Sequence, residues 1–126
     1  MIFGIGTDIV EVARIEASIT QFGDDFAKRI LAESEFLSYQ QSQIKARFLA
    51  KRFAAKEAFS KALGTGLRAP ATFQNIVVSH DNLGKPILVL AAELQAMMTS
   101  REITQTHISI SDEKNLAAAF VVLEIS

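Results

Sequence analysis

The chain of 126 residues contains no cysteine, which excludes disulfide bonds and metal sites built from thiolates. A reducing compartment is therefore permitted, and the cytoplasm is the default expectation. No apolar run approaches the roughly 18 residues that a membrane-spanning helix requires, so no membrane partner is expected. The apolar N-terminus lacks a basic region and meets Asp8 too early for a secretory signal, which favours the same location.

The chain also has almost no net charge, because thirteen lysines and arginines face fourteen acidic residues, giving −1. This balance argues against a general nucleic-acid binder. The basic residues are nevertheless concentrated, since nine of them lie between Lys28 and Arg68, where only three acidic residues occur. Such a segment is suited to phosphates or to an acidic partner protein.

The length is that of one domain with one modest core, so residues 1–126 are predicted to form a single domain. Apolar spacing and glycine stops predict a strand over 2–7, helices over 11–22, 24–31, 34–40 and 44–63, strands over 73–79 and 86–91, a helix over 91–101, and strands over 105–111 and 116–125. This order predicts an α+β fold in which a largely antiparallel sheet packs against the long central helix.

Two charged residues on the long helix, Glu57 and Lys61, are four positions apart and therefore share a face. The small residues Ala50, Ala54 and Ala58 flank them and are expected to leave room beside the carboxylate. The simpler interpretation is an exposed ion pair worth about 0.3 to 0.5 kcal/mol. Alone, this pair does not indicate a site.

Lys45, Arg52 and Lys56 are spaced as a separate stripe on the same helix, for which a solvated face is the simpler interpretation. From Lys45 to Lys61, however, six basic residues face a single acid, Glu57. A carboxylate in so cationic a helix is expected to stay ionised, as a magnesium ligand must.

Three further features combine a plain interpretation with a functional one. Asp8 follows a Gly-x-Gly strand and is predicted at its end, where it is either a helix cap or a ligand. Gly64, Thr65 and Gly66 form either a helix stop or a phosphate-binding turn. His107, Ser109 and Ser111 share one strand face, but nothing fixes the base and acid of a serine hydrolase.

Several segments closely resemble motifs of the holo-acyl-carrier-protein synthases, the small phosphopantetheinyl transferases. Two of them are GIGTDIVE over 4–11 and RFAAKEA over 52–58. The resemblance continues through KALGTG over 61–66, GKP over 84–86 and HISIS over 107–111. It therefore spans nearly the whole chain in the family's order and implies the 4′-phosphopantetheinyl transferase fold.

The resemblance implies Mg²⁺-dependent transfer of 4′-phosphopantetheine from coenzyme A to a serine of apo acyl carrier protein. Adenosine 3′,5′-bisphosphate is released, and the product supports fatty acid biosynthesis. Asp8 and Glu57 match the family's magnesium ligands, and Lys61 matches the lysine that contacts the pyrophosphate. These three are the implied catalytic residues; whether Glu57 acts as the base directly or through a metal-bound water stays open.

The resemblance also implies which residues surround the coenzyme, which meet the carrier and how the chain assembles. The residues that match the coenzyme surroundings are Arg52, Lys61, Gly64, Thr65, Gly66, Pro86 and His107. Arg14 matches an arginine that pairs with the acidic carrier, and the family implies a homotrimer with active sites at subunit boundaries. One departure is Asp112, where many relatives have histidine.

Two other functions remain as alternatives to the transferase. A noncatalytic module that binds a carrier protein or a nucleotide is disfavoured by the presence of Asp8, Glu57 and Lys61. A metal-dependent hydrolase of coenzyme A or another pyrophosphate would use the same ion to activate water. Only the presence of an acceptor distinguishes this hydrolase from the transferase.

Overall fold

The computed structural model describes residues 1–126 as an α+β fold, which confirms the predicted class. Its elements are, in order, β1 (Ile2–Glu11), α1 (Val12–Phe22), α2 (Asp24–Ile30), α3 (Glu33–Gln41), α4 (Lys45–Leu63), the 3₁₀ turn η1 (Phe73–Asn75), β2 (Ile76–His80), β3 (Pro86–Leu90), α5 (Ala92–Ser100), β4 (Ile103–Asp112) and β5 (Leu116–Ile125). No helix is both long and apolar enough to cross a membrane.

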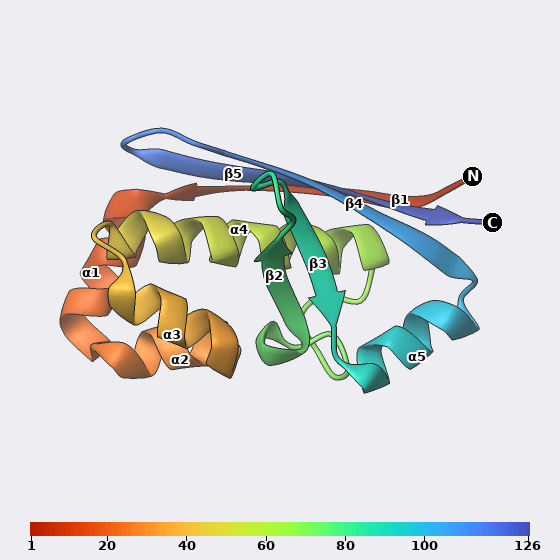
Figure 1. Ribbon diagram of the computed structural model, residues 1–126, viewed down its shortest axis with the longest axis horizontal. Helices are drawn as coiled ribbons and strands as arrows, with labels where there is room; N and C mark the ends of the chain where they lie inside the picture. The colour runs from red at the N-terminus through yellow and green to blue at the C-terminus, as the bar shows by residue number, and fades with distance from the viewer.

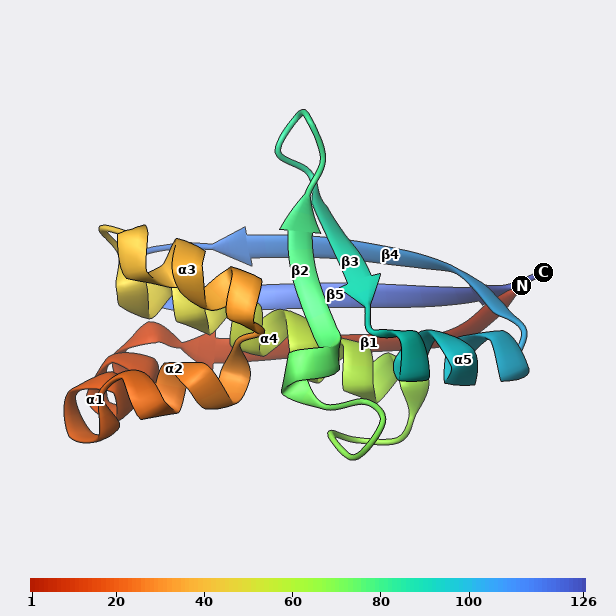
Figure 2. The same ribbon diagram turned by 60° about the horizontal axis from the view of Figure 1, so that its bottom comes forward.

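The strands form two separate antiparallel sheets. Strands β1, β5 and β4 pair in that spatial order, and β2 and β3 pair only with each other. Figure 1 shows α4 running along one face of the three-stranded sheet, with α2 and α3 on the other side of the helix and the β2–β3 hairpin crossing in front of it up to the level of the sheet. Figure 2 shows the hairpin loop projecting away from the rest of the chain.

The core lies around α4 and is built largely from small residues. Alanines at 50, 54, 58 and 62 of the helix are buried, and on β5 the buried residues alternate with more exposed ones, as expected for a strand with one covered face. Phe59 and Leu49 are completely buried on other sides of α4. The helix is therefore buried around much of its circumference, which suits the central place predicted for it.

Strand β1 and helix α4 approach so closely that two strand positions have no space for a side chain. A Cβ placed on Gly4 would lie 2.0 Å from the carbonyl oxygen of Ala62, and one on Gly6 would lie 2.0 Å from that of Ala58. The alanines of α4 thus make room for the backbone of β1. The expectation that Ala50, Ala54 and Ala58 leave space beside Glu57 is wrong, because these three methyl groups are buried in the core.

The first strand is longer than predicted, and this changes the place of Asp8. Strand β1 continues to Glu11, which is also the residue preceding the first turn of α1. Asp8 therefore lies within the strand, paired with Ala119 of β5, and does not cap a helix. Two other boundaries shifted: 73–75 forms the turn η1, and β4 begins at Ile103.

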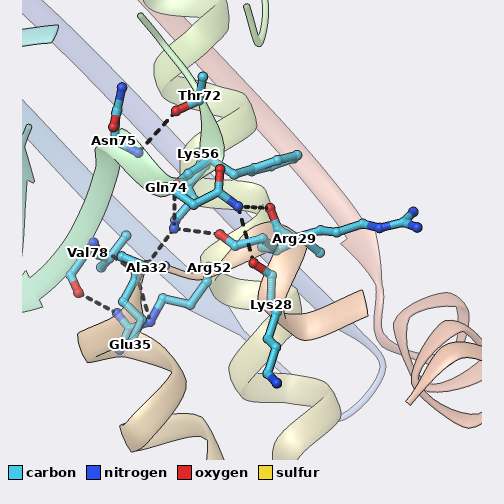
Figure 3. Close-up of polar contacts among 12 residues, drawn as sticks. Lys28, Arg29, Ala32, Glu35, Arg52, Lys56, Thr72, Gln74, Asn75 and Val78 are labelled. Atoms are coloured by element: carbon cyan, nitrogen blue, oxygen red, sulfur yellow. Dashed lines mark hydrogen bonds and ion pairs between the residues drawn. The ribbon is translucent and has the colours of Figure 1, made fainter. Parts of the chain in front are cut away.

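The predicted stripe of Lys45, Arg52 and Lys56 is not a solvated cationic face. Lys45 is exposed, but Lys56 is completely buried and Arg52 is only 9% exposed. Both buried cations turn toward the carboxylate of Glu35 on α3, as Figure 3 shows. The expectation failed because helical spacing places residues on a face without specifying what covers that face.

The face of the three-stranded sheet that points away from α4 is apolar and uncovered. Its large exposed side chains are Ile5 and Ile9 of β1 and Leu116 and Phe120 of β5. Figure 1 shows no helix on this side of the sheet. Apolar patches of this kind often mark protein interaction sites.

The close contact between β1 and α4 predicts that a side chain at position 6 destabilises the fold. We expect Gly6→Ala to lower the free energy of unfolding by at least about 3 kcal/mol, because the methyl group would meet the backbone of α4. The matched control is Gly64→Ala, where no atom lies within 4 Å and only the positive φ of 86° opposes the change, at a cost of about 1 kcal/mol. Urea unfolding measures both; equal losses would contradict the close contact.

Candidate active site

Asp8 and Lys61 form an ion pair between β1 and α4. The Lys61 ammonium lies 3.0 Å from Oδ1 of Asp8 and donates a second hydrogen bond, also 3.0 Å, to the carbonyl of Thr7. Asp8 follows Gly4 and Gly6 on the strand face that meets the helix. A Cβ on Gly6 would lie only 3.0 Å from Cβ of Lys61, so this glycine also leaves the lysine its path to Asp8.

Glu57 lies in the same pocket as Asp8, a hollow of about 650 Å³ between β1, α1 and α4, which we call the carboxylate pocket. Burial raises the pKa of Glu57, the charge of Asp8 raises it further, and Lys61 opposes both effects. From the sequence, the cationic helix was expected to favour the ionised form of Glu57. That expectation is wrong in direction. Among the basic residues of the helix, only Lys61 lowers the pKa of this carboxyl group, and the effect of burial outweighs it.

The carboxylate pocket provides a donor set that fits Mg²⁺. No group of three or more His, Cys, Asp or Glu side chains is gathered anywhere in the chain, so a site made only of protein ligands is absent. Mg²⁺ commonly binds one or two carboxylates and completes its shell with water and substrate phosphate. Asp8 and Glu57 match this pattern, and the raised pKa of Glu57 marks a carboxylate that a nearby cation would stabilise.

Arg14 also lines the carboxylate pocket, although it belongs to α1 and is largely exposed. Ser18 of the same helix and the rings of Phe26 and Phe53 complete much of the wall. The pocket thus joins two acidic groups, an exposed arginine and an apolar surface. Of the predicted site residues, the structure brings Asp8, Glu57, Lys61 and Arg14 together.

Arg52 and Pro86 lie in a second hollow of about 220 Å³, which we call the arginine pocket. Its lining residues come from α4, the β2–β3 hairpin and β4: Phe48, Lys51, Arg52, His80, Gly84, Pro86, Ile110 and Asp112. Burial and the charges of Arg52 and Lys51 lower the pKa of His80, against the opposite effect of Asp81. The two cations Lys51 and Arg52 outnumber the single carboxylate of Asp112 in this lining, which suits the pocket to an anion.

Asp112 lies at the rim of the arginine pocket and pairs with two cations of α4. Its Oδ2 accepts hydrogen bonds from Nη2 of Arg47 at 2.6 Å and from Nε at 3.2 Å, and Lys51 lies 3.9 Å from Oδ1. The residue that departs from the family pattern therefore joins the end of β4 to the start of α4.

The remaining predicted residues lie outside both pockets. Gly64 ends α4 in the left-handed conformation, and Thr65 and Gly66 follow it in the turn. His107 is exposed on the outer face of edge strand β4, where Nε2 lies 2.5 Å from Oε1 of Glu124. Neither Ser109 nor Ser111 hydrogen-bonds to this histidine, which leaves a serine hydrolase without support. The largest hollow, about 960 Å³ between α1 and the start of α4, contains no predicted site residue.

Three features in or beside these pockets were not predicted from the sequence. The first is Glu35, whose only sequence signal is its place in the first turn of α3, where it accepts a hydrogen bond from Ala32 N–H. The second is His80 in the arginine pocket. The third is the aromatic wall of Phe26 and Phe53. No spacing rule connects these positions, because each comes from a different element.

The family is decided by comparison with known proteins. The model of the 4′-phosphopantetheinyl transferase superfamily matches residues 4–121. The chain belongs to this superfamily. It is 56% identical to the holo-[acyl-carrier-protein] synthase of Nitrosomonas europaea, over 98% of this chain and 99% of the relative.

Solved structures agree with this family assignment. The crystal structure of the holo-[acyl-carrier-protein] synthase from Neisseria meningitidis is 47% identical, superposes with a TM-score of 0.95, and is matched over 98% of this chain and 99% of that one. The Bacillus anthracis synthase, solved in complex with CoA (3′,5′-ADP), is 43% identical with a TM-score of 0.83, over 100% and 99% of the two chains. The predicted fold and the predicted class of phosphopantetheinyl transferase are confirmed.

The raised pKa of Glu57 gives a prediction that needs no substrate. Asp8→Asn removes a neighbouring negative charge and should lower the Glu57 pKa, whereas Lys61→Met removes the opposing cation and should raise it further. A carbon-detected NMR titration of the Glu57 carboxyl group measures both shifts. The control is Glu16→Gln, an exposed residue outside the carboxylate pocket, which should move nothing. A rise of the Glu57 pKa in Asp8→Asn, or a fall in Lys61→Met, would contradict the geometry.

Proposed function

We propose that this transferase moves the 4′-phosphopantetheine group of coenzyme A to a serine of apo acyl carrier protein and releases adenosine 3′,5′-bisphosphate. The proposal is carried by the carboxylate pocket, which Asp8 and Glu57 line and where Lys61 pairs with Asp8, within a chain of this superfamily. The relatives bear the synthase name across the whole chain, and one neighbour was solved with CoA (3′,5′-ADP). Holo acyl carrier protein, the product, serves fatty acid biosynthesis.

Asp8 and Glu57 would hold the magnesium ion that this reaction uses. When bound, Mg²⁺ supplies charge neutralisation on the coenzyme pyrophosphate. Lys61 would also neutralise phosphate charge, because its ammonium lies beside Asp8 and can turn to a phosphate oxygen. Both pocket carboxylates and the lysine are therefore placed around one phosphate position.

Glu57 is also the proposed base for the carrier serine. A carboxylate is ordinarily a weak base at neutral pH, and the raised pKa of Glu57 brings it closer to the working range. The residue is half-buried at the wall of an open pocket, so a serine hydroxyl or a bridging water has access to it. Both routes of proton removal remain within this proposal.

Arg14 is the proposed contact for the carrier protein. It is exposed on α1 and shares the carboxylate pocket with Glu57, so a carrier that paired with it would present its serine near the two carboxylates. Carrier proteins of this class are acidic by the family resemblance, and complementary charges favour their encounter. Arg52, Gly64, Thr65, Gly66, Pro86 and His107 are proposed to surround coenzyme A.

One hydrophobic core with residues from β1 through β5 supports the proposal that residues 1–126 act as a single transferase domain. A homotrimer is proposed as its assembly. The uncovered outer face of the sheet supports it, because Ile5, Ile9 and Phe120 form an apolar patch that a second copy would bury. A cytoplasmic location remains a prediction.

The transfer reaction can be tested directly by intact mass. Apo acyl carrier protein incubated with coenzyme A, Mg²⁺ and this protein should gain one phosphopantetheine, and a chelator should prevent the gain. Asp8→Asn and Glu57→Gln should each lower the rate by at least about 100-fold while leaving the circular dichroism spectrum unchanged. Asp25→Asn, an exposed acid on α2 outside the pocket, is the matched control and should keep full activity.

The same experiment separates the transferase from the alternatives. If none of several candidate carrier proteins gained mass, the transferase proposal would be wrong. Cleavage of coenzyme A without any carrier would favour the metal-dependent hydrolase, whose acceptor is water. Near-normal turnover by either carboxylate variant would show that the metal pair is assigned wrongly.

The proposed trimer depends on the apolar outer face of the sheet. Phe120→Glu should convert a trimer into a monomer, because three charges would be buried without partners. Size-exclusion chromatography with light scattering measures the mass of each species. Leu83→Glu is the control, since Leu83 is 94% exposed at the hairpin tip, away from this face. A monomeric wild-type protein would contradict the proposal.

A further inference from the structure

Glu35 is a buried carboxylate. It has no part in the chemistry proposed for the two pockets, and the family resemblance implies no role for it. Only 3% of it is exposed, yet it lies at the meeting point of α3, α4 and β2 (Figure 3). A buried charge of this kind is costly unless every partner is in place. The arrangement of those partners indicates what the residue does.

The first carboxylate oxygen of Glu35 is used for hydrogen bonds within the chain. Oε1 accepts a 2.6 Å bond from the ammonium of Lys56 and a 2.8 Å bond from Ala32 N–H. Lys56 in turn donates to the carbonyls of Ile30 at 2.7 Å and Phe73 at 2.8 Å, so three acceptors use its three protons. Burial lowers the pKa of Lys56 to about 8, against the favourable effect of Glu35. This half of the cluster anchors the carboxylate.

The second oxygen is directed toward Arg52. Oε2 accepts a 3.0 Å bond from Val78 N–H and lies 3.7 Å from Nε of Arg52. Nη1 of the same guanidinium donates to the Val78 carbonyl at 3.0 Å, and the ring of Phe48 lies 4.6 Å from its central carbon. Nε of Arg52 is buried and makes no hydrogen bond, so Glu35 acts on the guanidinium through its charge, whereas the Val78 carbonyl and the Phe48 ring contact it directly. Its other terminal nitrogen, Nη2, has no partner within the chain.

We propose that Glu35 is a positioning residue that holds the Arg52 guanidinium in the arginine pocket, so that Nη2 is presented to an anionic group of coenzyme A. This inference rests on the proposed function, because it takes coenzyme A as the ligand of Arg52. The charged lining of the arginine pocket supports an anion as occupant, since Lys51 and Arg52 outnumber the one carboxylate there, Asp112. Without the carboxylate, the long arginine side chain regains rotamers that point away from the pocket.

The alternative is that Glu35 only stabilises the fold through Lys56. The two roles differ in whether the effect of Glu35 on coenzyme binding depends on Arg52. A purely structural role would lower stability and would affect every variant alike, whereas a positioning role acts only through Arg52. Double-mutant cycles measure this difference, because residues that act on one ligand through each other are not additive.

The test uses Glu35→Gln, which keeps the shape of the side chain and removes its charge. Transfer kinetics and titration calorimetry with coenzyme A should give a KM and a Kd that rise about tenfold, with kcat and the carrier KM within about twofold of wild type. In the Arg52→Gln background, Glu35→Gln should change the coenzyme KM by less than about twofold. Glu33→Gln, an exposed acid on the same helix, is the matched control and should leave both constants unchanged.

Equal effects of Glu35→Gln in both backgrounds, or a lowered unfolding midpoint with an unchanged coenzyme Kd, would overturn the inference. If Glu35→Gln does not fold, Arg52→Lys tests the same point, because lysine keeps the charge and loses the planar group that Val78 and Glu35 hold. An unchanged KM in that variant would also overturn it. Coenzyme binding without transfer by the wild type would contradict the proposed function alone, since the calorimetric cycle would still report the coupling.

Discussion

The contact between β1 and α4 is the constraint on which the rest of the structure depends. Because Gly4 and Gly6 have no side chains, the strand lies directly against the carbonyls of Ala62 and Ala58. Side chains of a strand alternate, so the next residue on the same face is Asp8. The first side chain that β1 directs at the helix is thus a carboxylate, and it lies where Glu57 and Lys61 are already present.

The opposite side of α4 is held by buried charge. Lys56 ties the helix to the end of α2 and to η1, and Glu35 ties it to α3 and β2. Replacing such a cluster with apolar residues often stabilises a protein, so stability alone is a weak reason for it. A cluster that also directs Arg52 into a pocket has a functional reason, and it leaves α4 fixed on both sides.

Much of the fold could be predicted from local patterns, whereas the site could not. The helix over 44–63 and the strand over 116–125 were predicted to within one residue, because apolar spacing and the Gly64 stop are local signals. Asp8 and Glu57 are 49 positions apart, and only the family resemblance paired them. The burial of Lys56 escaped prediction because its partner Glu35 lies 21 positions away on another helix.

The positions of the proposed coenzyme contacts around the axis of α4 limit which of them one copy of the helix can direct at the same ligand. Arg52 and Glu57 are five residues apart, which separates them by about 140° around the helix axis, and Arg52 and Lys61 are separated by about 180°. Side chains on opposite sides of one helix do not converge on a single small ligand. In the proposed trimer, Arg52 of one copy and Lys61 of another copy could contact the same coenzyme A. The apolar outer face of the sheet, with His107 on its edge strand, is the surface on which such copies would meet.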